Sequence, residues 1–144
     1  MPSLGGQPEF YLTVQLLLFR DRLRVVELMN KMMQGIGDAD LKKMAALVSR
    51  LPPPQPAAGA VDAERLEKGR ELAAQNRCNF CHQADYSGGQ NVPRLAGQRE
   101  DYLVRTLREY KNNTRRGYDA SMADVLYAIS DEQLLDLAHF LAHQ

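Results

Sequence analysis

Apolar residues recur at helical spacing in five stretches of the chain, with polar residues between them. Residues 8–20 and 38–50 carry apolar side chains three and four positions apart, which is the pattern of an amphipathic helix. The same spacing predicts helices over residues 62–75, 99–111 and 131–143. No stretch shows the sustained alternation of a half-buried strand. We therefore expect an all-α fold.

Two local signals mark boundaries in this pattern. Ser130-Asp131-Glu132-Gln133 predicts a capping box, in which the Ser130 hydroxyl and the Gln133 side chain satisfy each other's free backbone amides at the start of the last helix. Residues 51–60, LPPPQPAAGA, hold four of the seven prolines and cannot continue a helix. We expect this segment to be a linker between residues 1–50 and residues 61–144.

The two parts on either side of this linker share an internal repeat. Residues near the start of the chain recur 91 positions later, and after a change of two in the spacing further residues recur 93 positions later. The matched pairs are Pro2/Pro93, Leu4/Leu95, Gly6/Gly97, Gln7/Gln98, Tyr11/Tyr102, Leu12/Leu103, Leu16/Leu107, Arg24/Arg115, Met29/Met122, Ile36/Ile129, Asp38/Asp131, Leu41/Leu134 and Ala45/Ala138. Residues 61–92 have no counterpart in the first part. The sequence therefore indicates one complete repeat unit preceded by the C-terminal part of another.

Composition limits the classes of function. The 18 basic residues balance the 18 acidic ones, and the hydrophobic fraction of 44% is that of an ordinary globular chain. With only two cysteines, the chain is not a disulfide-rich scaffold. P-loops, Rossmann fingerprints, paired catalytic carboxylates and nucleic-acid motifs are not apparent, so no nucleic-acid partner is expected. No cationic and apolar segment of a secretory signal begins the chain, and the longest apolar run, residues 16–19, is too short to cross a bilayer.

Both cysteines lie in the sequence Cys78-Asn79-Phe80-Cys81-His82, which has the CxxCH pattern of c-type haem attachment. Two thiols on adjacent turns add to the two vinyl groups of the porphyrin, and the histidine that follows is placed to ligate the iron. Two other interpretations stay open at this point. The cysteines could be reduced and structural, or they could bind zinc together with His139 and His143.

Met122 favours the haem interpretation. It follows the polar, glycine-containing stretch 112–121 and precedes the capping serine of the last helix by eight residues, so we expect it on a loop. A covalent haem with a distal thioether ligand needs a methionine in such a place. Ligation by histidine and methionine gives a six-coordinate iron with a raised reduction potential and no open position for a substrate.

On these residues, the segment 62–144 resembles a class I cytochrome c domain, and the whole chain resembles the di-haem cytochrome c-four family. The resemblance is carried by CNFCH at 78–82, NVPRLAGQ at 91–98, YL at 102–103, Met122 and the ending SDEQLLDLAHFLA. It implies a class I cytochrome c fold over residues 61–144, preceded by a partial cytochrome c-like helical segment. It also implies that helix 62–75 crosses the last helix, with Gly69 close to Phe140. The alternative for Gly69 is a tolerated helix glycine that costs about 1 kcal/mol.

The resemblance also implies the site residues and the cofactor. One haem c is attached covalently to Cys78 and Cys81, and His82 and Met122 are the axial ligands of its iron. The carbonyl of Pro93 accepts the other ring N–H of His82 and orients the ring. Further residues are similar to those that surround the haem edge or the propionates, namely Arg115 and, less directly, Gln98 and Tyr102.

The chain departs from the di-haem family in its first part. Residues 1–50 contain no cysteine and no histidine, so Met29 has no iron of its own there. By the repeat offset, the missing cysteine falls outside the chain. We therefore expect an N-terminally shortened piece of a di-haem protein, with a natural mono-haem protein carrying a haemless appendage as the rival. Apolar faces left exposed in residues 1–50 would dock onto the second unit, a second copy or a partner.

The function that follows is single-electron transfer in a bacterial respiratory chain, without catalytic residues. The resemblance implies redox proteins as partners, a terminal oxidase first and a dehydrogenase second, including membrane-associated complexes. It also implies the periplasm, where covalent attachment of haem takes place. A basic segment between residues 99 and 116 is either a docking patch or a solvated helix face; its cations are Arg99, Arg105, Arg108, Lys111, Arg115 and Arg116. The alternative function is a haem-based enzyme or a gas or redox sensor in which Met122 leaves the iron.

Overall fold

The computed structural model describes residues 1–115 and 120–144, and in these residues it contains eight helices and no strand. The expected all-α architecture is confirmed. Three helices precede the proline-rich segment: α1 (Glu9–Arg20), α2 (Glu27–Met33) and α3 (Asp38–Ser49). The others follow it: α4 (Ala63–Gln75), α5 (Cys78–His82), α6 (Glu100–Lys111), α7 (Ser121–Leu126) and α8 (Asp131–Ala142). None of the helices in the described part has the length and apolar character that a membrane span requires.

The five helices expected from periodicity are all present, and their ends agree to within one residue. The capping box is confirmed, since the Ser130 hydroxyl accepts from the Gln133 amide at 3.2 Å and the Gln133 side chain accepts from the Ser130 amide at 2.8 Å. The pattern missed α2, α5 and α7. These helices have five to seven residues, too few for a 3.6-residue period to show.

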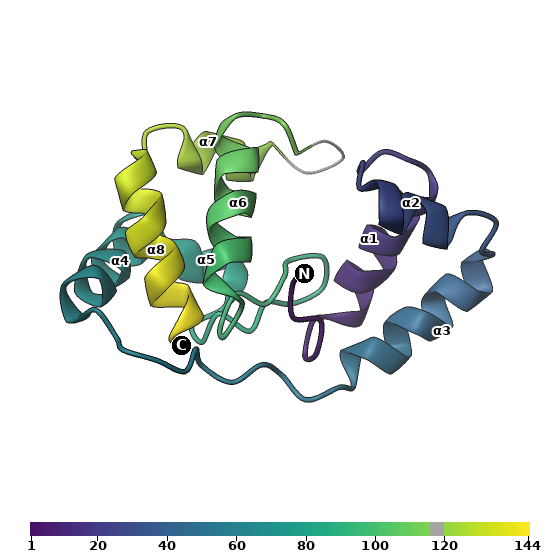
Figure 1. Cartoon of the computed structure of the whole chain (residues 1–144), viewed down its shortest axis with the longest axis horizontal. Coiled ribbons are helices and arrows are strands. Elements are labelled where there is room, and N and C mark those ends of the chain that lie inside the picture. The colour runs from purple at the N-terminus through teal and green to yellow at the C-terminus, as the bar shows by residue number, and fades with distance from the viewer. Residues whose placement is uncertain (116–119) are drawn as a thin grey trace.

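The chain forms two bodies joined by an extended segment, as Figure 1 shows. Helices α1 to α3 lie on one side, helices α4 to α8 on the other, and residues 51–60 run between them without a helix. Each body has its own buried cluster. The larger lies among α4, α6, α7 and α8, and the smaller is built on Phe19, Met33 and Leu41.

The repeat in the sequence recurs in the helix bounds. Residues 9–20 of α1 and 100–111 of α6 are 91 positions apart, and residues 38–49 of α3 and 131–142 of α8 are 93 apart. Helices α4 and α5, which carry the cysteines, have no counterpart in the first body. Without that partner, α3 exposes apolar surface: Leu47 is 67% exposed, whereas its counterpart Phe140 is 5% exposed. The expected exposed apolar faces of residues 1–50 are therefore present.

Helix α4 crosses α8 at Gly69, as expected. A Cβ atom at this position would lie 2.2 Å from the backbone oxygen of Asp136 and 2.5 Å from the Cβ of Phe140. Only a glycine permits this approach, so the interpretation of Gly69 as a merely tolerated glycine is wrong. The crossing brings the first turn of α4 beside the C-terminal end of α8 and encloses the larger core.

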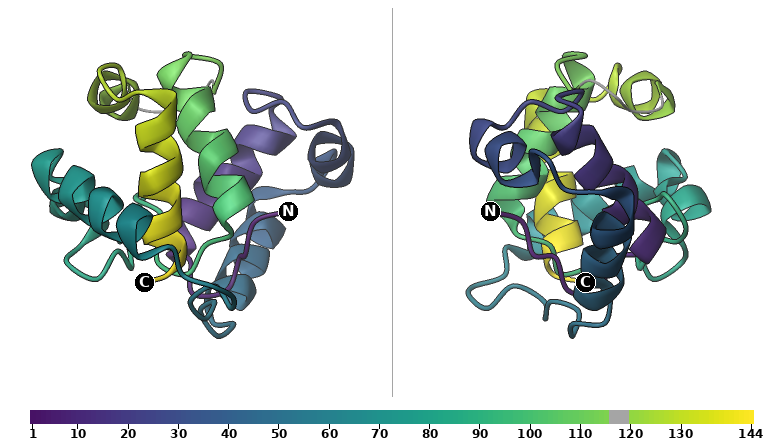
Figure 2. Two further views of the ribbon diagram at one scale, coloured as in Figure 1. Left: turned by 60° about the vertical axis from the view of Figure 1, so that its left-hand side comes forward. Right: turned by 90° about the vertical axis from the view of Figure 1, so that its right-hand side faces the viewer.

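The two bodies meet through loops, which the views in Figure 2 place between the helices. The side chain of Gln7 donates to the Arg94 carbonyl at 2.9 Å and accepts from the Arg94 amide at 2.9 Å. The side chain of Gln98 likewise donates to the Ser3 carbonyl at 2.8 Å and accepts from the Ser3 amide at 2.7 Å. A backbone bond from the Tyr11 amide to the Gln90 carbonyl, 2.9 Å long, adds to this join. Residues 1–50 therefore dock onto the second body, which is one of the three outcomes expected.

Candidate functional site

The two cysteines and the histidine of the CxxCH motif lie on one short helix, α5. Left-handed backbone at Arg77, with φ of 52°, precedes this helix, and Gln83, with φ of 71°, follows it. The helix is therefore a single isolated turn between two sharp bends. Cys78 is half-buried, Cys81 is exposed, and both thiols are free. Burial, together with the neighbouring Cys81, raises the pKa of the Cys78 thiol, partly offset by a backbone hydrogen bond.

The imidazole of His82 is buried and held by one hydrogen bond. Its Nδ1 lies 2.9 Å from the carbonyl oxygen of Pro93, which only accepts, so Nδ1 carries the proton. The hydrogen bond expected between these two residues is present. Burial lowers the pKa of His82, an effect that the Pro93 carbonyl only partly opposes. The ring is therefore neutral at pH 7, with its lone pair on Nε2, for which no partner is recorded among the described residues.

The loop after α5 brings the Pro93 carbonyl to the histidine. Gly88 donates to the His82 carbonyl at 2.9 Å, and Gly89 and Val92 exchange backbone hydrogen bonds of 2.9 and 2.8 Å across a tight turn. Gly88 has φ of 73°, and a Cβ atom there would lie 2.5 Å from the carbonyl carbon of Pro93. This glycine permits the close return of the chain that places Pro93 over His82.

These groups fit a c-type haem. Two free thiols lie three residues apart on one helical turn, next to a histidine whose Nδ1 is fixed and whose Nε2 is available. A ring N–H bound to a backbone carbonyl is the usual outer support of a metal-ligating histidine, since it fixes the ring and raises its basicity. The donor set therefore suits covalent attachment and axial ligation of one iron porphyrin.

Met122 lies in the first turn of α7, and not on a loop as expected from the polar stretch before it. Its side chain is half-buried and packs against the larger core cluster. The reason is the short helix itself, which begins at Ser121 and is too short to be seen in the sequence. In the first body, Met29 packs against the smaller cluster of buried residues.

Tyr102 and Arg115 lie together, and a residue that the sequence analysis did not select joins them. The Arg115 guanidinium donates to the Tyr102 hydroxyl at 3.4 Å and is paired with Glu109 at 2.9 Å. Arg24, from the first body, donates to the same hydroxyl at 3.3 Å. Arg24 is the repeat counterpart of Arg115, and that match was the only signal in the sequence that could have indicated its role.

Gln98 contributes to the join between the two bodies. Its side-chain oxygen accepts from the Ser3 and Arg99 amides at 2.7 and 3.0 Å, and its nitrogen donates to the Ser3 carbonyl at 2.8 Å. The side chain is 3% exposed. Because Ser3 and Arg99 engage both ends of the amide, we assign Gln98 to holding the first body in place.

The basic segment is largely neutralised by acidic residues. Arg99 pairs with Asp101 at 2.9 Å, Arg105 and Arg115 share Glu109, and Asp131 lies within 3.6 Å of both Arg108 and Lys111; Arg116 lies outside the described residues. Each described cation of the segment therefore has an acidic neighbour. This pairing favours a solvated helix face over an uncompensated docking patch.

The zinc alternative receives no support from the geometry. In the described part of the chain, His139 and His143 gather with Glu100 and not with the cysteines. The Nδ1 of His139 lies 3.1 Å from the Glu100 carboxylate, and its Nε2 accepts from the Asp62 amide at 3.2 Å. A metal on Nδ1 would force the ring proton onto Nε2, against the Asp62 N–H, so this trio is a structural link between the N-cap of α4, α6 and α8.

Comparison with known proteins agrees with this site. The family model described as cytochrome c matches residues 66–144. A thiosulfate dehydrogenase electron acceptor of Thiomonas intermedia (strain K12) is 32% identical, over 99% of this chain and 70% of the relative. A cytochrome c4 of Thiocapsa roseopersicina is 28% identical, over 97% of this chain and 77% of the relative.

Solved structures share the fold over nearly the whole chain. The cytochrome c4 of Acidithiobacillus ferrooxidans superposes with a TM-score of 0.84 at 26% sequence identity, covering 99% of this chain and 89% of that one. The thiosulfate dehydrogenase TsdBA of Marichromatium purpuratum superposes with a TM-score of 0.81 at 25% identity, covering 98% of this chain and 32% of that one. On the family model and these relatives, the chain belongs to the cytochrome c family and resembles its di-haem cytochrome c4 branch, and it is an electron carrier.

Proposed function

We propose that the chain carries single electrons on one covalently bound haem c, attached through Cys78 and Cys81. His82 would ligate the iron through Nε2, and Met122 would ligate it through sulfur. The observation that carries the proposal is the bond between His82 Nδ1 and the Pro93 carbonyl, because it leaves a neutral, oriented imidazole beside two free thiols. When bound, the haem supplies the iron that cycles between ferric and ferrous.

The protein's own residues orient and shield the site in this mechanism. The turn at Gly88 and the Pro93 carbonyl hold the His82 ring in one orientation, so little reorganisation accompanies electron transfer. Tyr86 packs edge-on against Phe140 of α8, with the ring centres 5.6 Å apart, and keeps water from this side of the core. No proton transfer or nucleophile is required, so we assign no catalytic residue.

The number of haems follows from the cysteines. The only two cysteines in the chain belong to one attachment turn, so we propose one haem in residues 61–144 and none in residues 1–50. The first body would serve as a haemless partner of the second. The Pro-rich residues 51–60 would be the linker between them.

We propose an oxidoreductase as the redox partner, and the periplasm as the place of action. Two curated relatives are named as electron acceptors of thiosulfate dehydrogenase, which favours a dehydrogenase as electron donor. A terminal oxidase would accept the electron. The periplasm is the compartment in which the family attaches its haem. Covalent attachment to Cys78 and Cys81 would therefore take place there.

Intact-mass analysis and an absorption spectrum test the proposal. After expression with haem-maturation machinery, we expect a mass increase of one haem and a reduced spectrum of a six-coordinate, low-spin iron. The double variant Cys78→Ala/Cys81→Ala should lose the added mass. A colourless protein of unchanged mass would contradict the proposal. A high-spin ferric iron that binds carbon monoxide when reduced would instead support the sensor or haem-enzyme alternative.

A further inference from the structure

A lysine in the last turn of α6 holds the end of the segment that carries Met122. The Nζ of Lys111 donates to the backbone carbonyl of Ile129 at 2.5 Å and lies 3.6 Å from the Asp131 carboxylate. Ile129 is 4% exposed, and in the described part of the chain no other hydrogen bond to its carbonyl is recorded. A charged donor on a buried carbonyl makes a strong bond, and its removal leaves that carbonyl unsatisfied.

The same contact recurs in the first body. Arg20, which lies in the last turn of α1 and 91 positions before Lys111, donates to the Ile36 carbonyl at 3.4 Å and pairs with Asp38 at 2.5 Å. Ile36 and Asp38 each lie 93 positions before the residue that Lys111 contacts in their place. Both cationic side chains are 23% exposed. A contact that recurs with equal burial at repeat-related positions is a feature of the fold and not an accidental surface pair.

The two contacts enclose segments of different length. The enclosing residues are 16 positions apart in the first body and 18 apart in the second. The change of two in the repeat spacing therefore falls inside the enclosed segment, and the contact at its base is kept. Each segment holds a short helix and a repeat-related methionine, α2 with Met29 and α7 with Met122. Figure 1 shows each short helix beside the longer helix that precedes it, which it contacts.

A backbone turn connects Ile129 to α7. The Ile129 amide donates to the carbonyl of Leu126, the last residue of α7, at 3.1 Å. Leu126 is 1% exposed, and Met122, one turn before it, packs against the same core cluster. Lys111 therefore holds against α6 the turn from which α7 and its methionine extend.

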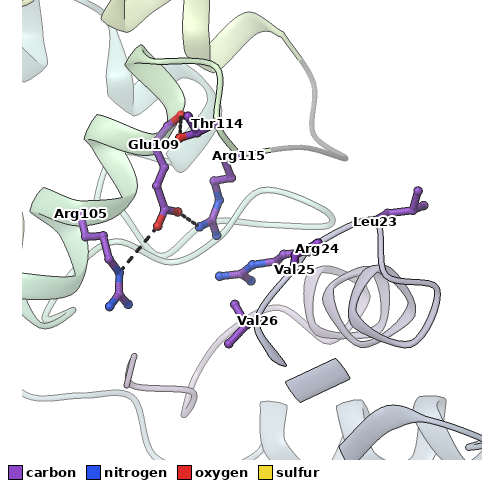
Figure 3. A pocket seen from close by; sticks show the side chains of 8 residues that line it. All are labelled: Leu23, Arg24, Val25, Val26, Arg105, Glu109, Thr114 and Arg115. Atoms are coloured by element: carbon purple, nitrogen blue, oxygen red, sulfur yellow. Dashed lines mark hydrogen bonds and ion pairs between the residues drawn. The ribbon is translucent and has the colours of Figure 1, made fainter. Parts of the chain in front are cut away.

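Neighbouring arginines do not make this contact. In Figure 3, Arg105 and Arg115 both point toward Glu109, from which they lie 3.8 and 2.9 Å away. Arg108 lies 3.2 Å from the carboxylate that Lys111 also approaches, and no bond from it to the backbone carbonyl is recorded among the described residues. Lys111 thus combines a charge with a backbone bond, whereas Arg108 brings a charge alone.

We propose that Lys111 is a positioning residue for Met122, which keeps the sulfur on the iron by holding the segment that carries it. The inference rests on the proposed function, in which Met122 is the second axial ligand. Outer groups that hold a metal ligand in place typically change metal affinity or activity by about 10–100-fold when they are replaced. Without the Lys111 contact, α7 should leave the core more often, and the fraction of protein with an open iron position should rise.

The test compares four variants of the haem-loaded protein by the binding of carbon monoxide to the reduced iron. Lys111→Leu removes the charge and the donor. Lys111→Arg restores both, with the side chain that the first body uses at Arg20. Arg20→Leu breaks the equivalent contact in the body where we propose no haem. Arg108→Leu removes a charge beside Asp131 and leaves the backbone bond intact.

We expect Lys111→Leu to bind carbon monoxide about tenfold more tightly than the wild type, because apparent affinity follows the fraction of protein from which the sulfur has left. Lys111→Arg should restore the wild-type affinity. Arg20→Leu and Arg108→Leu should stay close to it, because an exposed ion pair contributes little. A wild-type affinity in Lys111→Leu, or an equal gain in Arg108→Leu, would overturn the proposal.

Hydrogen exchange gives a second measurement that does not depend on the haem. Exchange at residues 121–129 should be faster in Lys111→Leu than in Lys111→Arg, and Arg20→Leu should produce the corresponding change at residues 27–36. Equal exchange in Lys111→Leu and Lys111→Arg would overturn the proposal even where a variant has lost its haem. Should Lys111→Leu fail to fold, Lys111→Gln, which keeps a shorter polar side chain, takes its place in both measurements.

The spectrum of Met122→Ala separates this inference from the proposed function. An unchanged spectrum in that variant would refute the ligand assignment, and the inference would fail with it. A changed spectrum, together with no effect of Lys111→Leu on carbon monoxide binding or on exchange, would refute the role of Lys111 alone.

Discussion

Gln7 and Gln98 occupy repeat-related positions, and each binds the backbone of the opposite body. Gln7 holds both the amide and the carbonyl of Arg94, and Gln98 holds both of these groups of Ser3. Ser3 and Arg94 are themselves 91 positions apart, as Gln7 and Gln98 are. The join is therefore a pseudo-symmetric pair of the same contact. It explains how 50 residues with a small core stay attached to the larger body.

Replacing either glutamine by alanine should destabilise the join between the bodies. Both side chains are at most 5% exposed, and each change removes the side-chain partner of at least two backbone groups, at a cost of about 1–3 kcal/mol for each group left unsatisfied. Chemical denaturation of Gln7→Ala, Gln98→Ala and the double variant would measure this loss. Gln34→Ala, at an exposed position, should change stability by less than about 0.5 kcal/mol. Equal effects at all three positions would contradict the role given to the pair.

Gly69→Ala should destabilise the second body strongly. The added methyl group would overlap the Asp136 carbonyl of α8, and backbone cannot yield as a flexible side chain can. We expect a loss of at least about 3 kcal/mol, at the upper end of overpacking effects. Thermal unfolding followed by circular dichroism would measure it. Gly37→Ala is the control, because nothing lies within 4 Å of a Cβ atom there; a comparable loss in both variants would rule out the explanation by close packing.

Met122→Ala should convert a low-spin iron into a high-spin one and permit carbon monoxide to bind the reduced protein. This follows from our assignment of the sulfur as the second axial ligand, since its loss opens a coordination position. Absorption spectra of both oxidation states would detect the change. Met29→Ala removes the repeat-related methionine, which packs in the smaller cluster, and should leave the spectrum unchanged. A spectrum of Met122→Ala identical to that of the wild type would refute the ligand assignment.

Tyr102 should ionise at a lower pH than an ordinary tyrosine, because Arg115 and Arg24 lower its pKa despite its burial. A folded-state pKa below the unfolded one means that the unfolded chain binds more protons in the window between the two values. Stability should therefore rise with pH across that window, and the gain should persist above the unfolded pKa near 10. Denaturation at several alkaline pH values, with Tyr102→Phe as reference, measures this. A parallel decline in both proteins would count against the shift.

Much of the fold was predictable because it depends on local signals. The five longer helices have enough turns for their apolar period to show, and the capping box at Ser130 depends on residues three apart. Helices α2, α5 and α7 were not found, because a helix of one or two turns has no period and depends on tertiary contacts. Met122 was placed on a loop for this reason.

The features of the site also divide into those that the local sequence predicts and those that depend on tertiary contacts. The CxxCH motif on which we base the proposed haem attachment lies in five consecutive residues, so it could be recognised from the sequence without any tertiary contact. The ion pairs of the basic segment with Glu109 and Asp131 could not be foreseen, because they depend on which acidic side chains the folded chain places near each cation. The hydrogen bonds that the Gln98 amide makes with Ser3 across the join could likewise not be foreseen, because the two residues lie 95 positions apart.

The sequence alone therefore determined the class of fold, the cofactor chemistry and the repeat, because each depends on residue types at short or regular spacing. The tertiary structure decided how residues 1–50 are held against the second body. It brings Arg24 into contact with Tyr102, 78 residues away, and it places the side chains of Gln7 and Gln98 against the backbone of the opposite body. Contacts of that kind depend on how two folded bodies meet, and no periodicity along a single chain records that geometry.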